Sequence, residues 1–396
     1  MAQDQNLVEF RSGFRNWLER TVPGDWKSLL QSDLRSFNVW WVSAMRDAGY
    51  GPPHWSKEVG GPGLSLMQQL VIYEETTQAD CPDYPGLFSC AYTHVHDTLT
   101  LHGTDEQIQT HLGPILRAER VWAQAFSEPE AGSDLASLRT RAVRDGDRYI
   151  VNGQKIWSTL APNADWAILL ARTDPEAPKH RGISYFLVDL HSHGVDVRPI
   201  KQITGAEDDF AEIFFTDVEI PVENLVGREN DGWRIANTTL AAERGPLAVP
   251  TALKLRDALA SARAAARDEI PDPDIFPVSA VGQRYAQLHG EVEILSEMLY
   301  GTLARFVEVG EPGPESSIIK LYLAPLMQRV SAFGLDLAGA AGHHEVGSRR
   351  QDRASDDWLV NHLGSWVWTI AGGSNQIQRN IIGEKVLGLP RDPLVK

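Results

Sequence analysis

The sequence predicts an α+β protein in which a helical region comes first, a small antiparallel β domain follows, and a second helical region ends the chain. Three observations predict this order. Apolar residues recur at helical spacing over roughly the first 120 residues, with few strand signals. Short β-prone runs broken by turns extend from Trp122 to about Gly227. Helical spacing returns from Gly232, and we expect the two helical regions to form one bundle-like body around a β insert.

Composition limits the classes of function. The chain has 396 residues, of which 42% are hydrophobic, and this fits one large fold or two to three packed domains. We expect domains at residues 1–121, 122–228 and 229–396. The formal net charge of -16 argues against nucleic acids and anionic membranes as partners, because both carry negative charge themselves.

The expected compartment is the cytoplasm. Cys81 and Cys90 are too few for a disulfide framework and indicate reducing conditions. The polar N-terminal segment has no apolar stretch typical of a secretory signal, and no run of about 18 apolar residues is present to span a membrane.

In the first helical region, a histidine pair suggests other chemistry. His94 and His96-Asp97 lie on a predicted helix, but no nucleophile elbow accompanies them, so a hydrolytic triad is not indicated. A second cluster, at residues 343–345, sits in a glycine-flanked loop without a third ligand at a standard metal spacing. We expect no metal site.

The β region contains the most informative stretch, residues 126–173. Asp145-Gly146 and Asn152-Gly153 are both typical of hairpin turns. A turn of small and hydroxyl residues leads into this hairpin, which ends in Trp157-Ser158-Thr159. A tryptophan beside hydroxyls and free strand-end N–H groups suits a planar heteroaromatic ligand, whereas the alternative is an ordinary β core with polar turns. No G-x-G-x-x-G follows a strand, so a Rossmann site is not indicated.

The second helical region contains two clear helices. An apolar stripe over residues 292–306 predicts one, and residues 318–340 predict a longer one with a probable kink at Pro325. The prolines of residues 270–277 predict a connector between helices. Near the end of the chain, Ala371-Gly372-Gly373-Ser374 is typical of a ligand-cradling turn before a helix, yet it has no group that moves a proton.

Three motifs carry a resemblance to the acyl-CoA dehydrogenases. They are EPEAGSD (128–134), VNGQKIW (151–157) and GGSNQIQRNIIGEKVLGLPR (372–391). The segments GGPG (60–63), HGTDEQ (102–107) and NLVGRENDGW (224–233) add to it, so the resemblance covers almost the whole chain. It implies an N-terminal helical domain, a central β domain and a C-terminal four-helix bundle that bind FAD, usually in a tetramer.

The resemblance also implies roles for individual residues. The residues that match FAD contacts are Phe126, Ser127, Trp157, Thr159, Ser374 and Gln376, with Thr159 near flavin N5. Ser133 matches a residue at the mouth of the acyl-CoA site. Gly339 and Gly342 resemble a turn that holds part of the FAD across a subunit interface, although Asp336 stands where that turn usually has glutamine.

One departure from the family concerns the FAD pyrophosphate. The family usually has Arg-x-x-Phe-Gly before its second C-terminal helix, and this chain lacks that motif. Arg267 and Arg284 are the candidates to replace its arginine. Some relatives that form mixed tetramers keep only some of their FAD sites, so a half-site or non-catalytic subunit stays open as an alternative.

A second departure concerns the catalytic base. Many members have a glutamate in the C-terminal turn, and Gly372 occupies its position. Other members carry the glutamate next to an arginine on the first helix after the β domain, and Glu243-Arg244 stands at that spacing after Gly232. The resemblance therefore implies Glu243 as base, Arg244 beside the substrate and the Gly372 N–H as donor to the thioester oxygen. Pro246 introduces a possible kink close to this base.

The function implied by the resemblance is FAD-dependent oxidation of an acyl-CoA to a trans-2-enoyl-CoA, with an electron-transfer flavoprotein as acceptor. The small residues Ala371, Gly372 and Gly373 leave room for a branched, cyclic or steroid-like acyl group. A nitroalkane oxidase or flavin monooxygenase on the same fold is a further alternative. We expect a homotetramer, with a dimer or heterotetramer left open.

Overall fold

The structure, a computed structural model, describes residues 2–79, 81–207, 209–242, 248–270, 272, 274–309, 315–343 and 357–390. The chain forms two compact units. The first comprises Met1–Gln202 and Glu207–Glu243, and the second comprises Ile203–Ala206 and Arg244–Lys396. Each unit is described in turn.

The first unit begins with helices, as predicted. They are α1 (Ala2–Thr21), α2 (Trp26–Ser32), α3 (Leu34–Asp47), α4 (Leu66–Gln78), α5 (His96–His102) and α6 (Asp105–Leu116), and a π-helical turn (Ala91–Val95) leads into α5. Polar side chains fix where two of these helices start. The Ser65 and Thr104 side chains each accept the backbone N–H three residues later, and a glutamine at that position bonds back to complete a capping box.

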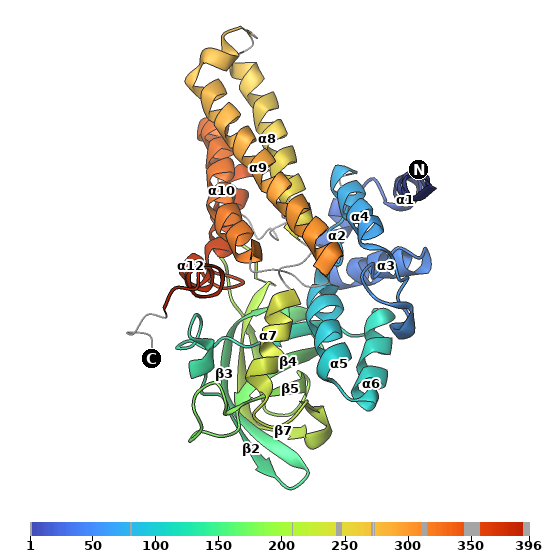
Figure 1. The fold of residues 1–396 in the computed structure, drawn as a ribbon, viewed down its shortest axis with the longest axis vertical. Coiled ribbons are helices and arrows are strands. Elements are labelled where there is room, and N and C mark those ends of the chain that lie inside the picture. The colour runs from blue at the N-terminus through green and yellow to red at the C-terminus, as the bar shows by residue number, and fades with distance from the viewer. Residues whose placement is uncertain are drawn as a thin grey trace. The chain divides into compact units, whose positions relative to one another are not determined.

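A single sheet of eight strands follows (Figure 1). Its strands are β1 (Trp122–Ala125), β2 (Arg141–Asp145), β3 (Arg148–Thr159), β4 (Trp166–Arg172), β5 (Ile183–Asp189), β6 (Val195–Pro199), β7 (Phe210–Pro221) and β8 (Leu225–Val226). The order is β6-β7-β3-β2-β4-β5-β8, with β1 beside β4. Most pairs are antiparallel, but β4 pairs in parallel with both β1 and β2, which the sequence did not indicate.

One of the two predicted hairpins is correct. Asp145 pairs with Arg148, so Gly146 lies in the two-residue turn between β2 and β3. The second prediction is wrong, because β3 runs straight through Asn152-Gly153 and its pairing with β7 shifts register there. The Asn152 side chain exchanges two 2.9 Å hydrogen bonds with Asp217 of β7. The segment that the sequence pattern predicts as a hairpin turn is therefore a β-bulge, bonded to a residue distant in the sequence.

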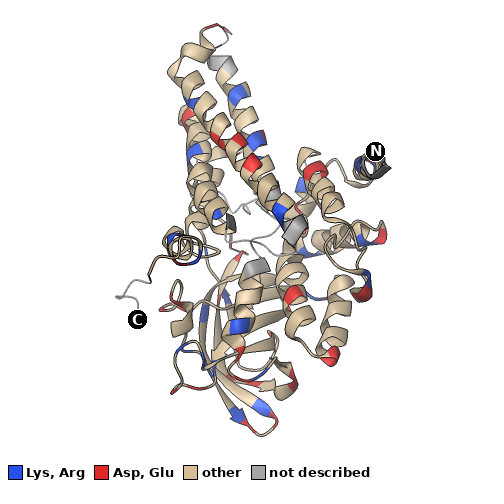
Figure 2. Ribbon diagram, in the orientation of Figure 1, with Lys and Arg blue, Asp and Glu red and all other residues tan. Residues whose placement is uncertain are grey.

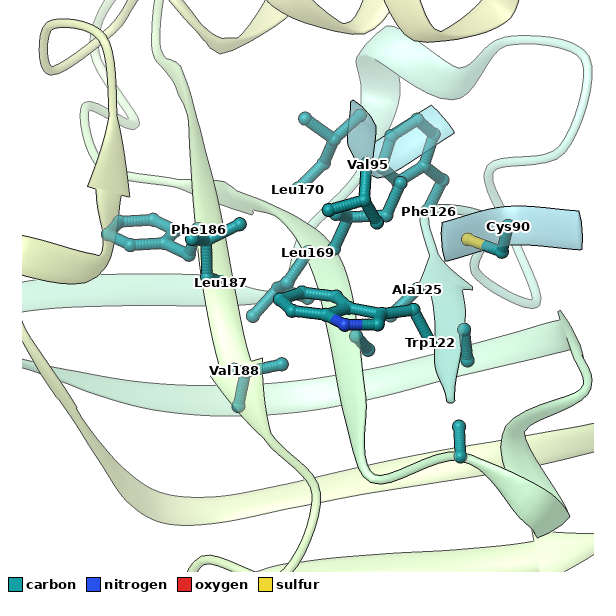
Figure 3. Close-up of a cluster of buried hydrophobic side chains, with 14 of the residues drawn as sticks. Cys90, Val95, Trp122, Ala125, Phe126, Leu169, Leu170, Phe186, Leu187 and Val188 are labelled. Atoms are coloured by element: carbon teal, nitrogen blue, oxygen red, sulfur yellow. The ribbon is translucent and has the colours of Figure 1, made fainter. Parts of the chain in front are cut away.

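One hydrophobic core joins α3, the π-helical turn, α5 and α6 to the sheet, whereas α1, α2 and α4 pack with α3 in a separate apolar cluster. Figure 3 shows Cys90 and Val95 from the helical segment beside Trp122, Leu169 and Leu187 from the strands. Gln107 of α6 adds a polar link, since its side-chain amide donates to the carbonyls of Glu223 and Leu225 at 2.7 and 2.9 Å. Burial of this shared apolar surface makes the helices and the sheet one compact unit. The last helix of this unit is α7 (Gly232–Ala242).

The second unit consists of helices. They are α8 (Ala248–Glu269), α9 (Ala280–Val309), α10 (Glu315–Ala338), α11 (Trp358–Ser365) and α12 (Asn375–Ile381). The predicted apolar stripe of α9 is buried at Val292, Leu295, Leu299 and Leu303, while the Phe306 side chain is outside the described residues. A Cβ at Gly334 of α10 would lie 2.1 Å from the Trp358 ring, so glycine permits the close approach of α11.

Charged residues are interspersed along the long helices of the second unit (Figure 2). Ion pairs join neighbouring helices there. Arg256 of α8 lies 2.9 Å from Glu293 of α9, and Arg329 of α10 pairs with Glu291 of α9. These pairs are partly exposed, so packing of the apolar faces is the main source of stability.

The helix, sheet and helix order and the three-part fold class are confirmed. The grouping of the helices is not as expected, because the first helical region shares a compact unit with the sheet and not with the later helices. The boundaries at residues 121 and 228 remain a prediction. In the part of the chain that the structure describes, no helix is long and apolar enough to cross a membrane.

Candidate active site

Two strand ends meet in the first unit at the expected flavin contacts. Phe126-Ser127 follows β1, and Trp157 to Thr159 ends β3. The Ile156 N–H donates to the Ser127 carbonyl at 2.9 Å, which holds the two segments side by side. Phe126 is buried and meets the Tyr185 ring edge-on at 5.7 Å, whereas Ser127 is half-buried.

Trp157 and Trp366, at 57% and 56%, are the most exposed tryptophans among the described residues, whereas Trp41, Trp55 and Trp122 are fully buried. The Trp157 backbone has a φ of 58°, a left-handed conformation that costs an L-residue on the order of 1 kcal/mol. Exposure alone does not distinguish Trp157, but a non-glycine residue in this strained conformation is typical of functional sites, which makes Trp157 a candidate ligand contact.

The residues that follow Trp157 differ in burial. Thr159 is exposed like Trp157, while Ser158 between them is fully buried. Among the described residues, nothing bonds to the Ser158 hydroxyl. The exposed residues at this strand end therefore present an aromatic ring and a hydroxyl, as the sequence suggested.

A buried ion pair lies behind this surface, and sequence reasoning missed it. Lys155 is fully buried, and its Nζ donates to Glu128 Oε1 at 2.8 Å and to the Phe126 carbonyl at 2.9 Å. Burial lowers the pKa of Lys155 to about 8. Burial alone raises the pKa of Glu128, but Lys155 and the Thr140 and Arg139 donors outweigh it and hold that pKa below its usual value. The available signal was a lysine at an inward position of an alternating strand.

Ser133 lies in the exposed loop between these segments. Its neighbour Asp134 is held by Lys179 Nζ at 2.9 Å and by the Ser137 hydroxyl at 2.5 Å. Ser133 itself is exposed, which suits a residue at the mouth of a binding site.

The glycine turn of the second unit is held from within. The Gln378 side-chain amide donates to the Gly372 carbonyl at 2.8 Å, and Lys320 Nζ of α10 donates to the Gly373 carbonyl at 2.5 Å. Both glycines have positive φ, 64° and 84°, which favours glycine at these positions. Gly372 and Gln376 are exposed, while the Ser374 hydroxyl caps α12 by accepting the Ile377 N–H at 3.3 Å.

The second glycine turn lies elsewhere in the same unit. Gly339 and Gly342 bound a short 3₁₀ turn at the end of α10, with Gly339 exposed at a φ of 53°. Nineteen helical steps separate Gly339 from Lys320, or roughly 28 Å along α10. Within this unit the two turns therefore do not form one site, which agrees with a role for Gly339 and Gly342 towards another subunit.

Of the two candidate arginines for the FAD pyrophosphate, the structure describes the side chain of Arg284. Arg284 Nη1 lies 2.6 Å from Asp336 Oδ2, and its guanidinium lies 5.3 Å from the Phe333 ring centroid. The residue that replaces the family's glutamine thus pairs with the candidate arginine. The Arg267 side chain is outside the described residues.

The expected base also lies beyond what the structure describes. Residues 243–247 are not among the described residues, so Glu243, Arg244 and Pro246 have no structural account. Helix α7, which ends at Ala242, is anchored to the sheet and to α5. Thr239 bonds to Thr98 at 2.8 Å and to the Tyr185 hydroxyl at 3.1 Å.

The histidines of the first unit form a cluster that includes an unexpected member. His96 Nδ1 lies 2.8 Å from Asp97 Oδ1, and His54 Nε2 lies 2.7 Å from the Tyr92 carbonyl. One ligand atom each from His54, His96 and Asp97 lies within 4.8 Å of the others. Trp55 stacks on His96 at 4.5 Å, and burial lowers the pKa of His54. Of the cluster at 343–345, only His343 is described, and it is exposed.

Comparison with known proteins covers almost the whole chain. The family models for the acyl-CoA dehydrogenase N-terminal, middle and C-terminal domains match residues 4–119, 123–218 and 230–387. The chain is 35% identical to acyl-CoA dehydrogenase IpdE1 of Mycobacterium tuberculosis over 98% of this chain and 99% of that protein.

Solved structures agree with the sequence relatives. The ChsE4-ChsE5 complex from Mycobacterium tuberculosis superposes with a TM-score of 0.81 at 30% identity, covering 98% of each chain. The Tcur3481-Tcur3483 steroid ACAD has a TM-score of 0.81 at 29% identity, again covering 98% of each chain. On three consecutive domain matches and full-length similarity, the chain belongs to the acyl-CoA dehydrogenase family of oxidoreductases.

Proposed function

We propose that this enzyme is a FAD-dependent acyl-CoA dehydrogenase that forms a trans-2-enoyl-CoA. The observation that carries the proposal is the surface made by exposed Trp157 and Thr159 beside Ser127, at the positions where the family contacts its flavin. An aromatic face with a neighbouring hydroxyl and strand-end N–H groups fits a planar ring with polar edges.

The resemblance assigns FAD contacts within each unit separately. Those of the first unit are Phe126, Ser127, Trp157 and Thr159, and those of the second are Ser374, Gln376, Gly339 and Gly342. FAD, when bound, supplies an acceptor for the hydride that leaves the β-carbon. Ser374 already caps α12, so its hydroxyl offers only its remaining hydrogen-bonding capacity to a cofactor.

The chain itself supplies the proton chemistry. Glu243 removes the α-proton of the thioester, which requires a partly desolvated carboxylate within hydrogen-bond reach of that carbon. The exposed Gly372 N–H donates to the thioester oxygen as negative charge develops there. Arg244 and Ser133 contact the substrate.

We infer a bulky acyl group as substrate, branched or derived from a steroid. Ala371, Gly372 and Gly373 bring little side-chain volume to the turn. A structural neighbour is a steroid ACAD, which supports this substrate class. An electron-transfer flavoprotein is the expected acceptor, and the thiols of Cys81 and Cys90 suit a cytoplasmic location.

The test replaces the proposed base. Glu243→Gln should slow flavin reduction by a steroid-derived acyl-CoA by about 10²-fold or more, while the FAD content stays at the wild-type level. Glu106→Gln, at an exposed position of α6, is the control and should react at the wild-type rate. If the flavin of the Glu243→Gln variant is reduced at the wild-type rate, Glu243 is not the base. Fast oxidation of the reduced enzyme by oxygen, with no bleaching by acyl-CoAs, would favour the oxidase or monooxygenase alternative.

A second candidate function is that of a half-site subunit in a mixed tetramer. The observation that favours it is the Arg284–Asp336 pair, because a guanidinium neutralised by its own chain binds a pyrophosphate less well. Measurement of FAD per chain in the protein purified alone separates the two functions. Full occupancy in a homotetramer excludes the half-site.

A further inference from the structure

The buried pair of Lys155 and Glu128 has no part in the proposed chemistry, although it lies directly behind the flavin-facing surface. Buried ion pairs are costly, and well-packed apolar residues often replace them without loss of stability. A fully buried lysine in the middle of β3 therefore points to a role other than holding the fold.

The pair gathers three separate segments of the chain. Lys155 Nζ binds the Phe126 carbonyl and Glu128 Oε1. The two oxygens of Glu128 also accept the backbone N–H groups of Thr140 at 2.8 Å and Arg139 at 2.6 Å. The carboxylate and the ammonium thus fix the segment after β1, the segment before β2, and β3.

Two adjacent carbonyls of the flavin-facing segment are held by two adjacent residues of β3. The Phe126 carbonyl accepts from the Lys155 side chain, and the Ser127 carbonyl accepts from the Ile156 backbone, both at 2.9 Å. Because both carbonyls are held, the orientation of Ser127 is set from β3.

A bulge interrupts regular strand pairing at the same place. The pairing of β3 with β7 shifts register between Lys155 and Ser158. Positive φ values of 58° and 63° follow at Trp157 and Leu160. The strand end that carries Trp157 and Thr159 is therefore irregular. The contacts at Lys155 and Ile156 lie just before the bulge, and Ser158 and Thr159 pair with β7 after it.

We propose that Lys155 and Glu128 are positioning residues, a buried charged strut that sets Ser127, Trp157 and Thr159 in the geometry that binds the flavin. The proposal rests on FAD as the cofactor of the proposed function. It concerns cofactor affinity and local order, and it does not depend on Glu243 or on the identity of the acyl group.

The test uses the full chain and compares two double variants. Lys155→Met/Glu128→Gln removes both charges of the strut, and it avoids the uncompensated charge that either single variant leaves buried. Arg148→Met/Glu219→Gln removes an exposed ion pair between β3 and β7 and serves as the matched control. Hydrogen exchange of the apoprotein and the Kd for FAD are measured for each.

The strut variant should remain folded, with faster exchange confined to residues 126–128, 139–140 and 155–160. Its affinity for FAD should fall by about tenfold, as for residues that orient metal ligands from behind, while the control matches wild type. If the amides of these segments exchange at the wild-type rate in the strut variant, the proposal is wrong. This outcome is independent of the proposed function, because it is measured on the apoprotein and holds even if the wild-type protein binds no FAD. If the strut variant exchanges these amides faster but binds FAD with the wild-type Kd, the pair does not contribute to cofactor binding.

Discussion

At the scale of single residues, Trp157 holds its ring outward on a backbone that L-residues seldom adopt. Asparagine tolerates this left-handed conformation better than tryptophan, but it has no ring to stack. We expect Trp157→Asn to leave the unfolding free energy of the apoprotein unchanged or slightly raised. The same change should weaken FAD binding by about 1 kcal/mol or more, as for loss of an aromatic stacking partner.

Thermal unfolding of the apoprotein and FAD titration measure the two effects separately. A Trp157→Asn protein that unfolds at a lower temperature and still binds FAD like the wild type would mean that the tryptophan is a packing residue.

The pH dependence of FAD binding provides a second test at this scale. Burial lowers the pKa of Lys155 to about 8 from 10.5, and the charges that act on it are Glu128 and Arg172. Between these pH values the unfolded chain binds more protons than the native one, so this group alone makes unfolding less favourable as pH rises. The strut nevertheless loses its positive charge over the same range. We therefore expect the affinity for FAD to fall as the pH rises through about 8, without a matching loss of stability.

The titration compares wild type with Lys155→Met/Glu128→Gln from about pH 6.5 to pH 9.5. The double variant has no charge to lose in the strut, so its FAD affinity should vary less with pH. Equal pH profiles would assign the pH dependence to the cofactor or to other groups.

The sequence was a better guide to some residues than to others. The segment Trp157-Ser158-Thr159 stood out as a local pattern of aromatic and hydroxyl residues, and Trp157 and Thr159 are both exposed. Their roles as flavin contacts came from the resemblance and stay a prediction. The pairing of Lys155 with Glu128 needed the fold, because the partners lie on different segments. The pairing of Arg284 with Asp336 also depends on two helices, α9 and α10, whose contact no local pattern specifies.

At the scale of elements, the C-terminal turn shows how a glycine pair and a helix cap combine. Ser374 accepts the Ile377 N–H at the start of α12. Ser374→Ala removes this cap and should destabilise the protein by about 1 kcal/mol, whereas Ser374→Asn keeps a capping side chain and should cost much less. Chemical denaturation of the apoproteins gives both values. If both variants also lose FAD affinity while only alanine loses stability, Ser374 contacts the cofactor as well as the helix.

The two Asx-Gly pairs of the β region show the limit of local patterns for elements. Asp145-Gly146 and Asn152-Gly153 predict the same turn, yet only the first lies in one. A Cβ at Gly153 would lie 2.5 Å from the Thr140 hydroxyl. Glycine at this position therefore permits the close approach of the backbone to Thr140, and it does not form a hairpin turn. Contacts with residues distant in the sequence therefore determine which of the two Asx-Gly pairs forms a turn.

At the scale of the whole molecule, the order of helices and strands was readable from periodicity, but the grouping into compact units was not. Helices α3, α5 and α6 join the sheet through the shared core, and Gln107 of α6 has partners more than a hundred residues later in the chain. Periodicity reports which face of an element is buried, and it does not report which element covers that face.

The assembly of the enzyme leads to a last prediction, at the Arg284–Asp336 pair. If the pair reduces the positive charge that Arg284 offers to the FAD pyrophosphate, Asp336→Gln frees this arginine and restores the residue type that the family usually has there. FAD bound per chain should rise, and binding should tighten by about tenfold, as expected for one additional charge-assisted hydrogen bond. Glu293→Gln, which frees Arg256 in a similarly exposed pair of the same unit, should change neither quantity.

Flavin absorbance per chain and the oligomeric mass in solution are measured together, because a rise in FAD that requires a tetramer places Arg284 at a subunit interface. Full FAD occupancy in the wild-type homotetramer, unchanged by either substitution, would show that Asp336 does not limit the cofactor and would leave the half-site function without support.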